Sequence, residues 1–278
     1  MKIAQAEYAW IGGSSTLSCV VGDLSADVEL QVLASDMIFS TPYGDSPKMQ
    51  YWQLTDIKGQ PRRILHCAMH GWRSGVTRAD ASRQIFYVFQ QAGVKEILAD
   101  GGVGAINNLL DLKDVVIPHD YMDFSMRQDV GLQDHYLLMM REPMCPSSSR
   151  ILWEQAQKLW PHRVFPRSVY VNTDGRHFES VAEVNFYKMA GGDVIGQSIA
   201  PEVYLAREIG ACYTGIYMIV NYAEGQVKPW QHEDLEYIFY NYSTRTAQVI
   251  IETFRHLAEK EVCACSDFRK PTLLKGVY

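Results

Sequence analysis

The chain has 278 residues, of which 47% are hydrophobic, and its formal net charge is −6. A nucleic-acid-binding surface needs clustered positive charge, so this balance argues against a nucleic-acid partner but leaves room for local basic pockets that bind small anions. No stretch approaches the ~20 apolar residues of a membrane span, and the N-terminal residues contain no apolar run of signal-peptide length. We therefore expect a soluble, cytoplasmic protein without membrane partners.

In chain order, short apolar runs alternate with helical patterns. The runs predict strands at 6–11, 62–69, 94–100, 168–172, 193–199 and 213–225, with a further apolar run at 114–124. Helical periodicity predicts helices at 79–92, 147–159, 181–190, 201–209 and 232–261; Gly93 ends the first helix, and Ser147, Ser148 or Ser149 caps the second. Runs that are apolar on both faces are typical of parallel strands covered by helices. We expect residues 1–278 to form a single α/β domain with a mixed, mostly parallel sheet flanked by helices.

The six cysteines give no metal or redox pattern. Most of them stand alone in apolar runs, which predicts buried free thiols. Cys263 and Cys265 are too close together for the common zinc or thioredoxin spacings, and the eight histidines are dispersed. We therefore expect no metal site.

Glycines and polar residues gather where the predicted strands end, in "IGGSS", "MHG", "DGGVG", "DGRHFES", "GQSIAPE" and "VNYAEG". Ligands of such sheets bind where strand ends and loops converge. One glycine-rich strand end alone is a tight turn as readily as a binding loop, so the recurrence is what predicts a site.

These strand ends, in this order, resemble those of the purine nucleoside phosphorylase and methylthioadenosine phosphorylase family. "TDGRHFESVAE" is similar to the family's Gly-Pro-x-Phe-Glu-Thr-x-Ala-Glu, and "GGDVIGQSIAPEVYLAREIGACY" to its Gly-Ala-Asp-Val-x-Gly-Met-Ser-x-x-Pro-Glu. The resemblance spans roughly residues 8–260. It implies a distorted barrel-like sheet, a trimer with sites near subunit interfaces, and reversible phosphorolysis of purine nucleosides. It also implies that inorganic phosphate is the co-substrate and that no organic cofactor is needed.

The resemblance implies that Glu179 and Asn221 read the purine. An ionised Glu only accepts hydrogen bonds, so it suits the N1–H of a 6-oxopurine, whereas an Asn amide can donate to O6 and N7. Phe178 would stack on the base or the sugar, and Gln197 stands where the family usually has Met against the ribose. The alternatives are a carboxylate at a helix N-terminus for Glu179, a turn former for Asn221 and core packing for Phe178.

For phosphate, the resemblance implies hydroxyl donors at Ser14 and Ser198, together with His70; backbone N–H groups of Gly101 and Gly102 could add to them. The family's phosphate arginine is missing, because Met69 occupies its position in "MHGWRSG". We expect Arg73 or Arg176 to point inward and replace it; otherwise both are solvated surface charges.

The 5′ end of the sugar is left open by the sequence. Hydroxyl-accepting members of the family use a histidine near the start of the last helix, for which His232 is a candidate, and methylthio-accepting members use small apolar residues. His135 could instead reach a neighbouring subunit's sugar site. The sequence also leaves open hypoxanthine or guanine as the base, and an oligomer larger than a trimer. Because of the missing arginine, a hydrolase that uses water and a nucleoside-binding protein without turnover remain as alternatives.

Overall fold

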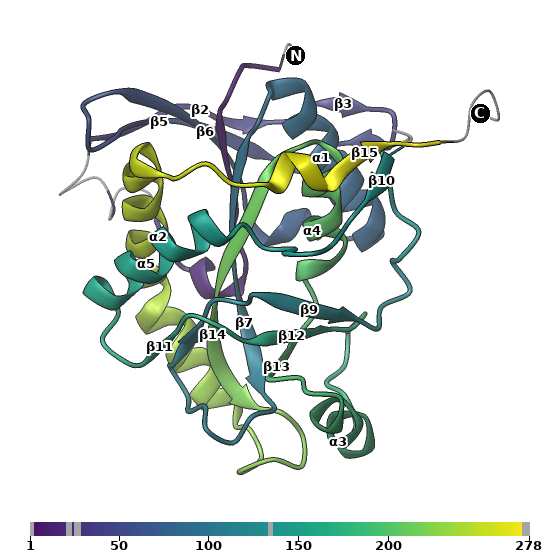
Figure 1. Cartoon of the computed structure of the whole chain (residues 1–278). Helices are drawn as coiled ribbons and strands as arrows, with labels where there is room; N and C mark the ends of the chain where they lie inside the picture. Colours follow the sequence, from purple (N-terminus) through teal and green to yellow (C-terminus); the bar gives the residue numbers. More distant parts are fainter. Residues whose placement is uncertain (1–2, 21–23, 25–28, 133–135, 274–278) are drawn as a thin grey trace.

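Two long parallel strands, β7 (Glu96–Ala105) and β14 (Cys212–Tyr222), run through the centre of the molecule (Figure 1). The computed structural model describes residues 3–20, 24, 29–132 and 136–273. In the main sheet the strand order is β11-β8-β14-β7-β1-β6-β5-β2, and β13, β12 and β9 extend it from β7. The remaining strands of this sheet are β1 (Tyr8–Ile11), β2 (Leu30–Met37), β5 (Met49–Thr55), β6 (Pro61–Cys67), β8 (Val115–Val116), β9 (Asp120–Asp123), β11 (Val164–Phe165), β12 (Val169–Asn172) and β13 (Val194–Gly196).

The pairings make this sheet mixed. Strand β7 pairs in parallel with β1 and β14, and β1 pairs in parallel with β6. The β5–β6, β2–β5 and β14–β8 pairs are antiparallel. Two small sheets join β3 (Ser40–Thr41) to β4 (Gly44–Asp45) and β10 (Tyr136–Leu138) to β15 (Arg269–Pro271). The predicted fold class, a mixed and mostly parallel sheet flanked by helices, is confirmed.

The helices lie close to their predicted positions. They are α1 (Arg78–Ala92), α2 (Pro146–Leu159), α3 (Val181–Met189), α4 (Ile199–Glu208) and α5 (His232–His256), with short 3-10 helices η1 (Ser14–Thr16), η3 (Met69–Gly71), η4 (Leu257–Glu259) and η5 (Cys265–Phe268). Gly93 ends α1 in the left-handed conformation, as predicted. The predicted serine cap of α2 is wrong: its N-cap is Cys145, and Pro146, whose missing N–H costs nothing at this position, opens the helix. Among the described residues, no helix is both long and apolar enough to cross a bilayer.

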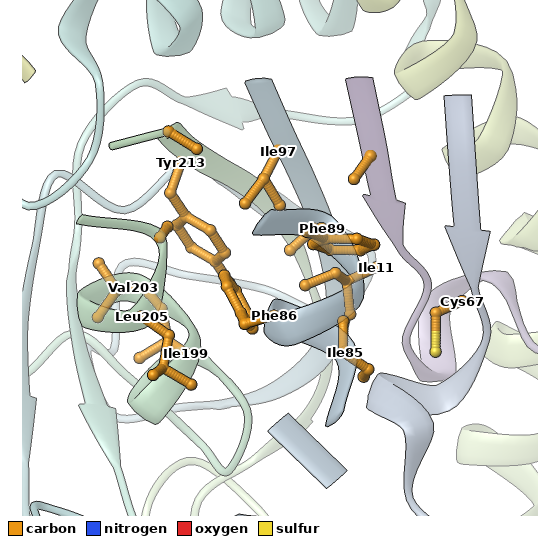
Figure 2. Packing of buried hydrophobic residues seen from close by; sticks show 14 of the residues in the cluster. Ile11, Cys67, Ile85, Phe86, Phe89, Ile97, Ile199, Val203, Leu205 and Tyr213 are labelled. Atoms are coloured by element: carbon orange, nitrogen blue, oxygen red, sulfur yellow. The ribbon is translucent and has the colours of Figure 1, made fainter. Parts of the chain in front are cut away.

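Apolar side chains on both faces of the sheet form the core. Ile97 and Ala99 of β7 face one cluster and Leu98 faces another, as the alternation of a strand requires. Figure 2 shows the first cluster, where Phe86 and Phe89 of α1 lie near Ile97 and Tyr213. Helices α2 and α5 cover the opposite face. With both faces covered, the open ends of the central strands are the places left for a ligand.

Candidate active site

A cavity of about 200 Å³ lies at the carboxyl ends of β7, β13 and β14. The pocket walls come from segments far apart in the sequence, which the parallel strands bring to one edge of the sheet. Nine of the predicted site residues line it: Ser14, His70, Gly101, Gly102, Phe178, Glu179, Gln197, Ser198 and Asn221. Met69, Trp72, Glu224, Leu235 and Phe239 also line it and were not assigned a role from the sequence.

Three of the named residues, Arg73, Arg176 and His232, do not line the pocket. The Arg73 guanidinium donates to the carbonyl oxygen of Gly71 (3.0 Å) and to Oε1 of Gln84 (2.6 Å). Arg176 and His232 are exposed. The expectation that Arg73 or Arg176 points into the anion site therefore does not match their positions. His135 lies outside the described residues.

The carboxylate of Glu179 is buried in the pocket wall, where Oε1 accepts a hydrogen bond of 2.5 Å from the Thr173 hydroxyl. The N-terminus of α3 is capped by other residues. The Ser180 hydroxyl accepts from the backbone N–H of Glu183, and the Glu183 carboxylate accepts from the backbone N–H of Ser180. Because this capping box serves the first turn, Glu179 is left to face the cavity.

A β-bulge aims Asn221 at the same cavity. The register of β14 against β7 shifts between Ile219 and Asn221, which pair with Val103 and Gly104. Such a bulge redirects the side chain that follows it. The amide Nδ2 donates to the carbonyl oxygen of Tyr222 (2.9 Å), which uses one of its two hydrogens. A Cβ on Gly104 would lie 3.2 Å from this Nδ2, so glycine lets the amide approach β7 closely.

The turn after β1 is held by a buried carboxylate, that of Asp100 on β7. Oδ1 accepts from the Gly13 N–H (3.1 Å) and the Ser15 hydroxyl (2.6 Å), and Oδ2 from the Trp10 indole (2.8 Å). Burial raises the pKa of Asp100. The Ser14 hydroxyl, next in this turn, accepts from the Gly102 N–H (3.0 Å), so its own hydrogen is left to point into the pocket.

His70 is held in an unusual backbone conformation beside this turn. Its φ is 52°, and the preceding Met69 also has a positive φ of 50°. Left-handed backbone costs about 1–2 kcal/mol for each such residue, so the surroundings must hold it. The His70 N–H donates to the Gly12 carbonyl (2.9 Å), and Nδ1 lies 2.7 Å from Oε1 of Glu202. A Cβ on Gly13 would be 2.7 Å from Nε2, which places that ring nitrogen against the turn.

A guanidinium that the sequence analysis missed, that of Arg78, stands behind the pocket wall. Nη1 donates to Oε1 of Gln197 (2.9 Å), and the guanidinium carbon lies 3.9 Å from the centre of the Trp72 ring. Burial, followed by the charges of Arg127 and Arg176, lowers the pKa of Arg78. Its position concealed it, because Arg78 begins α1 and belongs to none of the motifs at the predicted strand ends.

Ser198 lines the pocket. Its side chain is buried, and Oγ lies 3.3 Å from the Tyr170 hydroxyl. Gln197, the preceding residue, is held from two sides. Nη2 of Arg127 donates to its carbonyl oxygen (3.0 Å), and its own Nε2 donates to the carbonyl of His177 (3.3 Å).

The pocket wall that α5 contributes is apolar. Leu235 and Phe239, four residues apart, lie on one face of the helix and line the cavity. A Cβ on Gly102 would lie 2.9 Å from the Phe239 ring and 3.0 Å from Oγ of Ser14. The Phe239 ring is therefore next to the β1 turn.

Comparison with known proteins agrees with this geometry. A model of the phosphorylase superfamily matches residues 19–255. A probable 6-oxopurine nucleoside phosphorylase from Korarchaeum cryptofilum is 32% identical over 199 residues, which are 65% of this chain and 73% of the relative. A probable S-methyl-5′-thioinosine phosphorylase from Methanopyrus kandleri is 31% identical over 188 residues, 66% of this chain and 73% of the relative.

The fold has close counterparts among solved structures. A methylthioadenosine phosphorylase sourced from an antarctic soil metagenomic library superposes with a TM-score of 0.82 at 20% identity, covering 98% of this chain and 94% of that one. The chain belongs to the phosphorylase superfamily, in the branch of the purine nucleoside and methylthioadenosine phosphorylases.

Proposed function

We propose that this superfamily member cleaves the N-glycosidic bond of 6-oxopurine nucleosides with inorganic phosphate, releasing the free base and a pentose 1-phosphate. The observation that carries the proposal is that Glu179 and Asn221 share one buried pocket with Ser14, His70 and Ser198. The first two match a 6-oxopurine, and the last three are the hydroxyl and imidazole groups expected around phosphate. Phosphate is itself the nucleophile, so the reaction requires no organic cofactor.

Base recognition follows from donor and acceptor matching. The Glu179 carboxylate can accept the N1–H of hypoxanthine or guanine, whereas adenine would present a bare lone pair there. Asn221 can donate its second amide hydrogen to O6 or N7. As the C1′–N9 bond breaks, electron density flows into the purine and strengthens that hydrogen bond, so Asn221 stabilises the transition state more than the bound substrate. The exposed Phe178, whose ring meets Trp230 edge-on at 5.0 Å, would cover the base or the sugar.

Phosphate would enter on the side of the β1 turn. Ser14 and Ser198 provide hydroxyl donors, and Nε2 of His70 faces the same turn. From there an oxygen of phosphate attacks C1′ as the sugar develops oxocarbenium character, the C1′–N9 electrons pass to the purine, and the purine is protonated as it leaves. Gly101 and Gly102 let the backbone of β7 approach the reactants closely. The Gly102 N–H, which was expected to donate to phosphate, donates to the Ser14 hydroxyl instead.

We assign the role of the missing family arginine to Arg78. Its guanidinium contacts the side chains of both Gln197 and Trp72, which line the pocket. Arg127 reaches only the backbone carbonyl of Gln197, Arg73 bonds elsewhere and Arg176 is exposed. A dianion in a poorly hydrated pocket needs positive charge nearby. Acting through Gln197, Arg78 is a positioning residue rather than a direct ligand.

The 5′ substituent is best matched by a methylthio group. Leu235 and Phe239 give the pocket an apolar wall, and His232, the candidate acceptor for a 5′-hydroxyl, lies outside it. An apolar wall leaves a hydroxyl without a hydrogen-bond partner but accepts a thioether. We therefore favour 5′-methylthioinosine over inosine.

We also propose a homotrimer, a cytoplasmic location and a single nucleoside phosphorylase-like domain over residues 1–278. The trimer is supported by the family resemblance and by exposed apolar side chains on α3 and just after β9. Phe124, Met126, Phe186 and Met189 are each at least 42% exposed, and the Phe124 and Phe186 rings meet at 5.9 Å. The mass of the protein in solution tests the assembly.

The decisive experiment measures release of the free base with and without phosphate: hypoxanthine from 5′-methylthioinosine and inosine, guanine from guanosine and adenine from adenosine. Release that depends on phosphate is the expected result. Equal release without phosphate would identify a nucleoside hydrolase. Tight nucleoside binding without product in either buffer would identify a binding protein.

A further inference from the structure

Four of the six cysteines meet at one point of the structure. Cys145 is the N-cap of α2, Cys212 begins β14, and Cys263 and Cys265 lie in the segment after α5. Their Sγ atoms all lie within 4.8 Å of one another, and three of the four residues are buried. In the sequence only Cys263 and Cys265 stand close together, because the other two thiols come from segments more than fifty residues away.

The distances suit one metal ion surrounded by the four sulfurs. Tetrahedral zinc binds thiolates at about 2.3 Å, which places the sulfurs about 3.8 Å from one another. Cys212 and Cys263 are 3.4 Å apart here. We propose that Cys145, Cys212, Cys263 and Cys265 form a four-thiolate binding site for one structural zinc ion. This inference is independent of the proposed enzymatic function.

The charges around the cluster favour thiolates. Nζ of Lys260 lies 3.0 Å from Sγ of Cys212 and also pairs with the Glu96 carboxylate. Zinc with four thiolates carries a net charge of −2, which a nearby ammonium partly offsets. Cys145 sits at the N-terminus of α2, where the helix dipole stabilises an anion.

The site would join the C-terminal segment to the sheet. Cys263 and Cys265 precede β15, which pairs with β10 along one side of the molecule (Figure 1). Cys212 and Asn221 stand at opposite ends of β14, ~30 Å apart at the usual rise per residue of a strand. The metal would therefore stabilise the fold without touching the reactants.

The test begins with the full-length protein purified without chelators or added metal. We expect elemental analysis to find about one zinc per chain. The Cys263→Ser/Cys265→Ser double variant should lose at least about nine tenths of it, because two of the four ligands are gone. Cys19→Ser, which changes a half-buried cysteine outside the cluster, should retain it. Chelation should lower the melting temperatures of the wild type and of Cys19→Ser. It should leave the melting temperature of the double variant unchanged, because that variant has already lost the metal.

A second measurement separates zinc from disulfides between the same cysteines. The protein is reduced, given one equivalent of zinc or cobalt, and dialysed. Retained zinc, or the absorption of tetrahedral cobalt thiolate, supports the site even if the purified protein was oxidised. Failure of the reduced wild type to retain either metal would overturn the proposal, as would equal zinc content in the double variant.

Discussion

Nδ1 of His70 lies 2.7 Å from Oε1 of Glu202, and both side chains are buried. Glu202 also accepts a hydrogen bond of 2.9 Å from the Tyr213 hydroxyl. The carboxylate therefore sets the orientation of the imidazole, whose other nitrogen faces the β1 turn. In the proposed mechanism the Glu202 carboxylate favours the doubly protonated imidazole, whose Nε2–H then donates to phosphate.

Replacing Glu202 by Gln tests that role. The variant keeps the size of the side chain but removes the charge opposite the imidazole. Loss of a charge-assisted hydrogen bond costs about 1.5–3 kcal/mol, so we expect the KM for phosphate to rise ~10-fold or more. The nucleoside KM should change little. Steady-state kinetics with each substrate varied in turn measures both, and circular dichroism establishes that the variant is folded. An equal rise in both KM values would mean that Glu202 only maintains the fold.

The second prediction concerns the cation behind the pocket. Arg78→Ala should raise the KM for phosphate ~10-fold, because it removes the positive charge and frees the Gln197 side chain. Arg73→Ala is the matched control, since its guanidinium bonds to Gly71 and Gln84 outside the pocket. If Arg73→Ala raised the KM and Arg78→Ala did not, our assignment would be wrong.

The sequence predicts a site residue well when the residue lies in a short motif, and poorly when its position depends on packing against distant segments. Glu179 and Asn221 were found because each lies in a short motif at a predicted strand end. Strand β2 was not predicted, because its side chains are mostly exposed on both faces and show no apolar alternation. The direction of an arginine side chain is not encoded locally either. Packing around Trp72 and Gln197, not the position of Arg78 in the chain, brings its guanidinium to the pocket.

The third prediction is a loss of stability in alkali. Burial raises the pKa of Tyr170 to about 12, whereas an unfolded chain releases the phenolic proton near pH 10. Between these values the unfolded state binds fewer protons, so the free energy of unfolding falls as pH rises. The stability contributed by the protonated Tyr170 side chain is fully present below pH ~10. By pH ~12 the free energy of unfolding has fallen by about 3 kcal/mol because of this group. Urea unfolding at a series of pH values measures the slope, which Tyr170→Phe should reduce. An unchanged slope in that variant would assign the alkaline loss to other tyrosines.

The fourth prediction is the base preference. A mismatched buried polar group costs a few kcal/mol, so 6-oxopurine nucleosides should exceed their 6-amino counterparts in kcat/KM by at least ~100-fold. Asn221→Asp should erode that ratio, because a carboxylate accepts from the 6-amino group of adenine and repels O6. The assay compares matched pairs with the same 5′ substituent. Equal turnover of both bases by the wild type would refute the proposed reading of Glu179 and Asn221.

The last prediction concerns the 5′ end of the sugar. An apolar wall discriminates only modestly between two substrates that differ by one buried group. A hydroxyl placed against Leu235 and Phe239, however, also loses its hydrogen bonds to water. We therefore expect kcat/KM for 5′-methylthioinosine to exceed that for inosine by ~10-fold or more. Phe239→His, which offers the hydroxyl a partner, should reduce that ratio by lowering the KM for inosine. His232→Ala is the control: because this histidine is exposed at the start of α5, its removal should leave the ratio unchanged. If His232→Ala selectively weakened inosine cleavage while Phe239→His had no effect, the histidine would be the 5′ reader and the apolar wall would not set this specificity.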